Sequence, residues 1–146
     1  MFVNQKISET LAVLATLDPA SQAASTVTTG WVDASTYLAL MAEIQTGVLG
    51  ASATVDAKLQ QATDNSGTGV KDITGKAITQ IVKVSGDNKQ ALINMKASDL
   101  DTEGGFRFVR LSLTVGTAAS LVSATLYGGI ARYGVVSNQA GTVQVV

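Results

Sequence analysis

Three carboxylates alternate along the segment 99–103, where Asp99, Asp101 and Glu103 are each separated by one residue. Oxygen ligands at this spacing can bind Ca²⁺, which takes carboxylate and carbonyl oxygens. A hand-type calcium loop also needs a glutamate at its twelfth position, and that position counted from Asp99 is Arg110. We therefore predict a solvated loop here and no metal site.

The chain lacks two residue types that often carry catalysis, because it contains no histidine and no cysteine. Their absence removes the commonest general base, cysteine nucleophiles, thiolate metal ligands and disulfides. The remaining acidic residues show no clustering that would oppose two carboxylates across a cleft, as glycoside hydrolysis requires. Residues 64–67, Asp-Asn-Ser-Gly, are most simply a turn, and no glycine run matches a phosphate-binding loop. We expect no enzyme activity and no cofactor.

Aromatic and arginine side chains are the remaining candidates for binding. Trp31 is the single tryptophan, and we expect it to anchor the core or its rim rather than to form a ligand platform. Phe106 and Phe108 share the strand face of Arg110, which is otherwise polar. They are either exposed anchors for a partner or are covered by a loop. The candidate interface residues are Trp31, Phe106, Phe108, Arg110, Val143 and Val145.

The composition favours a protein that is packed against neighbours in an assembly. Only 14% of the residues are charged and 46% are hydrophobic, so the surface must be rich in small uncharged polar side chains. The net charge is -1 and neither sign forms a block, so we expect no nucleic-acid partner. No apolar run reaches the ~18 residues of a membrane span, and residues 1–6, MFVNQK, do not resemble a signal peptide. We expect no membrane partner and no crossing of a membrane by the chain's own signal.

The clearest element signals are two neighbouring apolar and polar alternations, FRFVRLSLTV at 106–115 and SLVSATLY at 120–127. In the first, Val109, Leu111, Leu113 and Val115 fall on one face of an extended strand, and this period of two marks a half-buried strand. The four residues 116–119 between them are short enough for a hairpin connection. A sheet with one solvated face follows.

Further strands are expected at 37–45, 53–60, 77–84 and 90–96, and residues 70–74 are expected to form a short strand or a bend, with turns about every ten residues. This spacing predicts an all-β fold, an antiparallel β-sandwich of the jelly-roll kind, whose strand order the sequence does not give. We assign the sandwich domain to residues 30–146 and expect a further short apolar strand at 143–146.

The N-terminal segment is harder to interpret. Residues 5–17 fit a helix or a strand equally well, and Asp18-Pro19 is expected to end whichever forms. Residues 20–29 are small and polar, consistent with an extended arm on this or a neighbouring subunit, or with a plain surface connection. We assign residues 1–29 to an N-terminal arm.

Four segments carry a resemblance to a known family: 26–37 (TVTTGWVDASTY), 52–80, 106–118 (FRFVRLSLTVGTA) and 128–134 (GGIARYG). They resemble small β-sandwich structural proteins encoded in the head-gene clusters of tailed bacteriophages and prophages. The resemblance implies a capsid decoration or cement protein that binds and stabilises a lattice of the major capsid protein. It further implies a homo-oligomer, with a trimer favoured, located on the capsid surface of the virion and assembled in the host cytoplasm.

Two other roles stay open beside decoration. One is a head-tail connector or tail component, which would form a ring. The other is a carbohydrate-binding β-sandwich module, although such modules usually display several exposed aromatic residues and this chain has only 5% aromatic residues.

Overall fold

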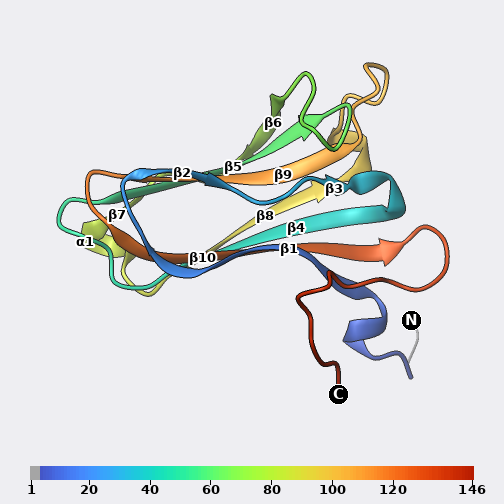
Figure 1. The fold of residues 1–146 in the computed structure, drawn as a ribbon, viewed down its shortest axis with the longest axis horizontal. Helices are drawn as coiled ribbons and strands as arrows, with labels where there is room; N and C mark the ends of the chain where they lie inside the picture. The colour runs from blue at the N-terminus through green and yellow to red at the C-terminus, as the bar shows by residue number, and fades with distance from the viewer. Residues whose placement is uncertain (1–3) are drawn as a thin grey trace.

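The computed structural model describes residues 4–146 and shows two antiparallel sheets packed face to face (Figure 1). The four-stranded sheet has the order β1 (Leu11–Gln22), β10 (Ser120–Ala131), β4 (Tyr37–Thr46) and β8 (Gln90–Lys96). The six-stranded sheet has the order β2 (Ser25–Thr28), β9 (Phe108–Gly116), β5 (Thr54–Ala62) and β6 (Lys71–Ala77); β3 (Val32–Asp33) pairs with β9 and β7 (Ile81–Val82) with β5. The helical turns are η1 (Ile7–Glu9), η2 (Ala34–Thr36), α1 (Lys83–Gly86) and η3 (Ala97–Asp99).

The pairing of the main strands is that of a hairpin rolled up on itself. With the short β3 and β7 set aside, the first strand pairs with the last, β1 with β10, and the second with the second last, β2 with β9. In the same way β4 pairs with β8 and β5 pairs with β6. This nesting is the jelly-roll arrangement, so the predicted antiparallel sandwich of the jelly-roll kind is confirmed.

The core lies between the sheets and is built from the alternations that the sequence displays. In β9 the inward side chains Val109, Leu111 and Leu113 are all 0% exposed. Leu126 of β10 is equally buried on the opposite sheet. The predicted half-buried strands at 106–115 and 120–127 are therefore confirmed.

The connection between these two strands is not a hairpin. β9 belongs to the six-stranded sheet and β10 to the four-stranded sheet, so residues 116–119 carry the chain across the core from one sheet to the other. Both strands still bury alternate side chains, because each sheet turns one face toward the shared core. The alternation alone therefore could not distinguish pairing within a sheet from crossing between sheets.

The N-terminal segment is largely part of the sandwich, which corrects the predicted arm of residues 1–29. β1 and β2 are edge strands of the two sheets, and Ala12 and Ala15 lie in the core. Register shifts interrupt β1 between Val13 and Ala15 and between Leu17 and Ala20, which hides its periodicity. Proline is tolerated at such an irregularity on an edge strand, so Asp18-Pro19 does not end β1. Residues 1–3 of the predicted arm lie outside the described residues.

Two further strand predictions are corrected. Residues 143–146 form no strand; the segment after β10 instead follows the edge of β1. The predicted strand at 77–84 is divided among the end of β6, the short β7 and the beginning of α1. None of the helices formed by residues 4–146 is long and apolar enough to cross a membrane.

Candidate functional site

The alternating carboxylates of segment 99–103 point to separate cationic partners. Asp99 lies 3.0 Å from the ammonium of Lys76 and Asp101 lies 2.5 Å from that of Lys71. The hydrogen bond from the Lys96 backbone, followed by the one from Lys76, lowers the pKa of Asp99. The hydrogen bond from Lys71 is the main cause that lowers the pKa of Asp101. Within residues 4–146, no group of three or more acidic side chains is arranged to hold a metal ion.

The other carboxyl groups with a resolved shift also have lowered pKa values. Asp64 accepts hydrogen bonds from the backbone of Ser66 and Thr68, and the interaction with Thr68 is the main cause of its lowered pKa. The pKa values of Asp72 and Asp87 are lowered chiefly by hydrogen bonds from lysines. A general acid at neutral pH needs a raised pKa instead. That the chain is not an enzyme stays a prediction.

Trp31 and Arg110 come together on the outer face of the six-stranded sheet. The guanidinium of Arg110 lies 4.6 Å from the centre of the Trp31 ring, and its Nε donates to Oε1 of Gln60 over 3.0 Å. The indole also lies against Gly67, where an added Cβ atom would come within 2.9 Å of the ring nitrogen. Gly67 also has a φ of +86°, so both the close approach and the backbone conformation require glycine here. Trp31 is thus a half-buried rim aromatic.

Phe106 and Phe108 are half-buried beneath cations. The ammonium of Lys71 lies 4.0 Å from the centre of the Phe106 ring. The guanidinium of Arg107 lies 5.0 Å from the centre of the Phe108 ring, and the same side chain is 3.3 Å from Asp33. These rings are partly covered by their own chain, and their role in an interface stays a prediction. The covering lysine was not recognisable in the sequence, because Lys71 is distant along the chain and carries no motif.

The outer face of the four-stranded sheet has a different character. Leu92 and Leu121 are 56% and 47% exposed on it. Near its centre the hydroxyl of Tyr127 donates to Oε2 of Glu43 over 3.1 Å, and burial, followed by that hydrogen bond, raises the pKa of Tyr127. Sequence reasoning missed this face, because outward positions of β4, β8 and β10 are recognisable only once the strands are paired.

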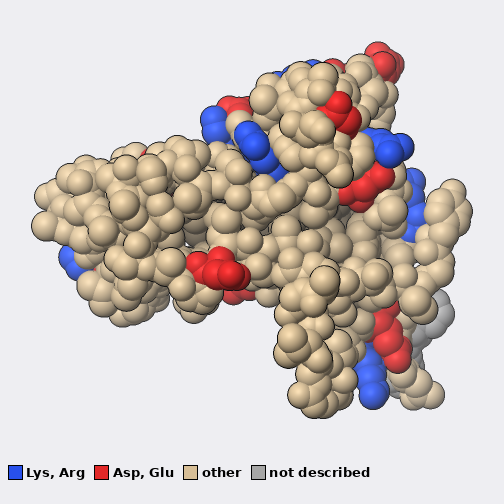
Figure 2. All heavy atoms as spheres, in the orientation of Figure 1, with Lys and Arg blue, Asp and Glu red and all other residues tan. Residues whose placement is uncertain are grey.

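Charged residues are distributed unequally between the sheets. The strands of the four-stranded sheet contain three, Asp18, Glu43 and Lys96. The strands of the six-stranded sheet contain seven, Asp33, Asp56, Lys58, Lys71, Asp72, Lys76 and Arg110. On the face drawn in Figure 2, charged side chains gather around β6 and the neighbouring loops, whereas few are visible at the opposite end.

An uncharged groove of about 530 Å³ opens beside β4, β8, β10 and the bulged part of β1. Its lining includes Pro19, Gln45, Asn88, Gln90, Leu121 and Ser123, and none of its lining residues carries a charge. The groove combines an exposed leucine with amide and hydroxyl groups. Such a surface can associate with another protein without desolvating a charge.

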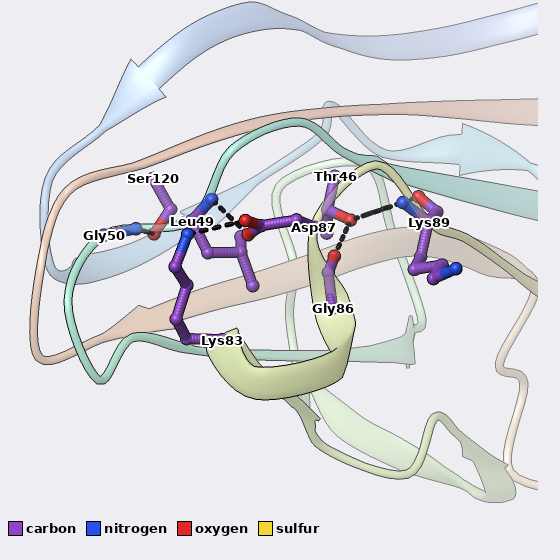
Figure 3. A network of polar contacts seen from close by, with 8 residues as sticks. All are labelled: Thr46, Leu49, Gly50, Lys83, Gly86, Asp87, Lys89 and Ser120. Atoms are coloured by element: carbon purple, nitrogen blue, oxygen red, sulfur yellow. Dashed lines mark hydrogen bonds and ion pairs between the residues drawn. The ribbon is translucent and has the colours of Figure 1, made fainter.

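Buried hydrogen bonds fix the loops at this end (Figure 3). Thr46, the last residue of β4, is 2% exposed. Its hydroxyl donates to the carbonyl of Gly86 over 2.6 Å and accepts from the backbone N–H of Lys89 over 3.1 Å. One hydroxyl thereby ties the segment after α1 to the end of the four-stranded sheet.

A carboxylate and a serine extend this network (Figure 3). Asp87 accepts from the backbone of Leu49 over 2.9 Å and lies 2.6 Å from the ammonium of Lys83. The hydroxyl of Ser120, which is 1% exposed, accepts from the backbone N–H of Gly50 over 3.0 Å. The loops that cross between the sheets at this end are therefore held in place.

The first described residues and the C-terminal segment both lie on the side of the four-stranded sheet and project away from the sandwich (Figure 1). The C-terminal segment is attached to β1, because the Gln139 backbone donates to the carbonyl of Val13 and the Val13 backbone donates to Asn138, each over 2.8 Å. Beyond this attachment Val143 and Val145 are 96% and 57% exposed. These two candidate interface residues are well separated in the chain from the cluster around Trp31.

No protein-family model matches the chain, and no curated protein matches it. A chain in the cryo-EM structure of Broad Bean Stain Virus is similar over 100% of this chain and 97% of its own length, with 10% identity and a TM-score of 0.48. The SPBc2 prophage-derived protein YomS is similar over 81% of this chain and 93% of its own, with 10% identity and a TM-score of 0.43. The CBM22-2 xylan-binding domain of Paenibacillus barcinonensis Xyn10C is similar over 84% and 88%, with 9% identity and a TM-score of 0.46. These likenesses concern the β-sandwich and assign no function.

Proposed function

We propose that the protein is a virion structural protein of a tailed phage, a capsid decoration protein that binds the lattice of the major capsid protein. The observation that carries the proposal is the outer face of the four-stranded sheet, which exposes Leu92 and Leu121 among few charges. Apolar side chains exposed among few charges favour association with another protein. The resemblance of segments 26–37, 52–80, 106–118 and 128–134 supplies the class of partner.

The lattice-binding surface in this proposal is the outer face of the four-stranded sheet together with the projecting terminal segments. Both lie on the same side of the molecule (Figure 1). The cation-covered rings of the six-stranded sheet then face away from the shell. Rigid loops around Thr46 and Asp87 support the shape of the uncharged groove.

Decoration would act through binding equilibrium rather than chemistry. A protein that bridges capsomers of the expanded shell and does not bind the unexpanded shell shifts the equilibrium toward the expanded state. A trimer would multiply weak contacts by avidity. The site of action is the capsid surface, after assembly in the host cytoplasm.

Carbohydrate binding is a less favoured alternative. Sugar rings stack on open aromatic faces, and here Arg110, Lys71 and Arg107 each lie over one aromatic ring. A sugar would have to displace a cation from each ring before stacking on that face. A connector or tail component is distinguished from a decoration protein by its assembly, because a connector forms a ring of fixed size.

The experiment is to measure the mass of the purified protein in solution and its co-sedimentation with expanded, undecorated capsids of the phage that encodes it. We expect a monomer or small oligomer that coats the shells at a fixed copy number. A large ring, or failure to bind shells together with binding on a glycan array, would contradict the proposal.

A further inference from the structure

We propose that residues 141–146 add as a β-strand to the free edge of β8 in a second copy of this chain. The inference rests on the strand edges of the sandwich and holds independently of whether the partner of the assembly is a capsid.

The donor segment, residues 141–146, has the sequence pattern of a β-strand but forms no strand in the single chain. Residues 141–146 read GTVQVV, with no charge and no proline, and three of the six residues are valine. Val143 and Val146 are 96% and 98% exposed. Within residues 4–146, the only hydrogen bond recorded for this segment is from the Thr142 backbone to the carbonyl of Gln139, over 3.0 Å. β-Branched residues with free backbone groups favour pairing with a sheet edge.

The acceptor edge is β8, which pairs only with β4. Their register is continuous from Ala39↔Lys96 to Gln45↔Gln90, with no bulge. Among the described residues, the backbone of residues 90–95 makes no recorded hydrogen bond outside the ladder with β4. Residues 90–95 carry no charge, and Leu92 is 56% exposed. A regular, uncharged edge of this kind can accept a further strand.

The other sheet edges are less suitable. The outer side of β1 is already occupied at Val13 by residues 138 and 139 of the same chain. β6 carries Lys71, Asp72 and Lys76 and pairs irregularly with β5. β2 has only four residues. Charges, irregular pairing and short length are the features that protect edge strands from association.

The donor and the acceptor lie at opposite edges of the same sheet. The C-terminal segment leaves the molecule beside β1, and β8 is separated from β1 by β10 and β4. Neighbouring strands are about 4.8 Å apart, so the segment would cross four strand spacings, about 19 Å, before it could lie along the free edge of β8 of its own chain. Six extended residues reach only about 20 Å, so too little length would remain for pairing. The acceptor is therefore a second copy.

This geometry makes the contact head-to-tail, because each copy offers a donor at one edge and an acceptor at the other. Head-to-tail contacts close into a ring when the rotation between copies allows it. A closed trimer is one such ring. The number of subunits in the ring would be set by the curvature of the combined sheet.

Cysteine trapping tests the inference directly, because the chain contains no cysteine. Gln144→Cys lies in the donor segment and Leu92→Cys on β8; Thr74→Cys on β6 is the matched control, since Thr74 is also exposed on an edge strand. After mixing two variants and mild oxidation, we expect at least tenfold more heterodimer from Gln144→Cys with Leu92→Cys than from Gln144→Cys with Thr74→Cys. Equal yields, or none with Leu92→Cys or with Asn94→Cys, would overturn the inference.

A truncation gives an independent readout. Removing residues 141–146 should convert the oligomer to a monomer that still unfolds in one cooperative transition, because these residues form no strand in the single chain. The thermal midpoint of the truncated chain should be lower than that of the full-length oligomer, because association stabilises the folded state. An unchanged mass after truncation, or a full-length chain that is monomeric at 1 mM concentration or above, roughly the weak limit of specific association, would contradict the inference. Capsid co-sedimentation is scored separately, so failure of strand addition and failure of lattice binding are distinguishable.

Discussion

The two outer faces of the sandwich are organised by different interactions. On the six-stranded sheet, cations cover aromatic rings and pair with carboxylates, as in the contacts of Arg110 with Trp31 and of Lys58 with Asp72. On the four-stranded sheet, Leu92 and Leu121 are exposed and charges are few. The first face satisfies its polar groups within the chain, whereas the second leaves apolar surface available to a partner. We therefore expect a partner to bind the face with fewer charges rather than the face with more aromatic rings.

Charges placed on the four-stranded sheet should have the largest effect on binding. The double variant Leu121→Lys with Thr125→Lys should weaken capsid binding about 100-fold, or about 2.7 kcal/mol, because the ammonium groups would be desolvated in the contact. Thr26→Lys on the six-stranded sheet is the matched control, and it should change affinity by no more than about twofold, the scale of a surface substitution outside the contact. Binding isotherms from co-sedimentation measure both. Equal losses of capsid affinity for the two substitutions would show that the two faces do not differ in their contribution to capsid binding.

Removing the indole of Trp31 tests whether the outer face of the six-stranded sheet stabilises the fold rather than binding the capsid. Trp31→Ala should lower the free energy of unfolding by about 2 kcal/mol, less than for a fully buried ring, because the half-buried indole packs against Arg110 and Gly67. Capsid affinity of the folded variant should stay unchanged. Urea denaturation and co-sedimentation provide the two measurements, with Trp31→Phe as a milder control. A large loss of binding without loss of stability would instead make Trp31 an interface residue.

The buried hydroxyl at the end of β4 should matter for stability more than surface ion pairs do. Thr46→Val keeps the side-chain shape but leaves the Gly86 carbonyl and the Lys89 amide without their partner. We expect a loss of about 1–2 kcal/mol in the free energy of unfolding, measured with urea. Thr46→Ser retains the hydroxyl and should lose less. Equal losses for the two variants would mean that the methyl group, and not the hydrogen bonds, stabilises this end.

The smallest effect should come from the ion pairs of the six-stranded face. The hydrogen bond from Lys58 is the main cause that lowers the pKa of Asp72 in the folded chain, so the contribution is present above the unfolded pKa of about 3.9 and is lost as pH falls through the lower folded value. Asp72→Asn should cost about 0.5 kcal/mol or less at pH 7, because both side chains are substantially exposed. Urea midpoints should be flat from pH 7 to about 5 and fall below about 4, with a smaller fall in the variant. A urea midpoint that increases as the pH is lowered would contradict the predicted direction of the pH dependence.

The strand content could be predicted from the sequence, because alternation is a local property. The segments 37–45, 53–60 and 90–96 correspond closely to β4, β5 and β8. Sheet membership could not be predicted in the same way. β9 and β10 alternate identically, yet they lie in different sheets, and only the pairing of distant strands reveals it. The strand β1 could not be distinguished from a helix, because two register shifts interrupt its period and its core residues Ala12 and Ala15 are small.

The candidate surfaces were only partly predictable. The parity of Phe106, Phe108 and Arg110 follows from the strand alternation, but the indole beneath Arg110 comes from a separate loop. The glycine that admits this ring, Gly67, was recognised only as a turn residue. The outer face of the four-stranded sheet was not predicted, since its exposed leucines come from strands distant in sequence.

The most direct test of the central claim is a cryo-EM reconstruction of expanded capsids saturated with the protein. We expect ordered density on the shell in which the four-stranded sheet and the terminal segments face the major capsid protein, with the Trp31 cluster turned outward. Density in which the six-stranded sheet faces the shell would contradict the assignment of the binding face. Shells without added density would contradict decoration itself.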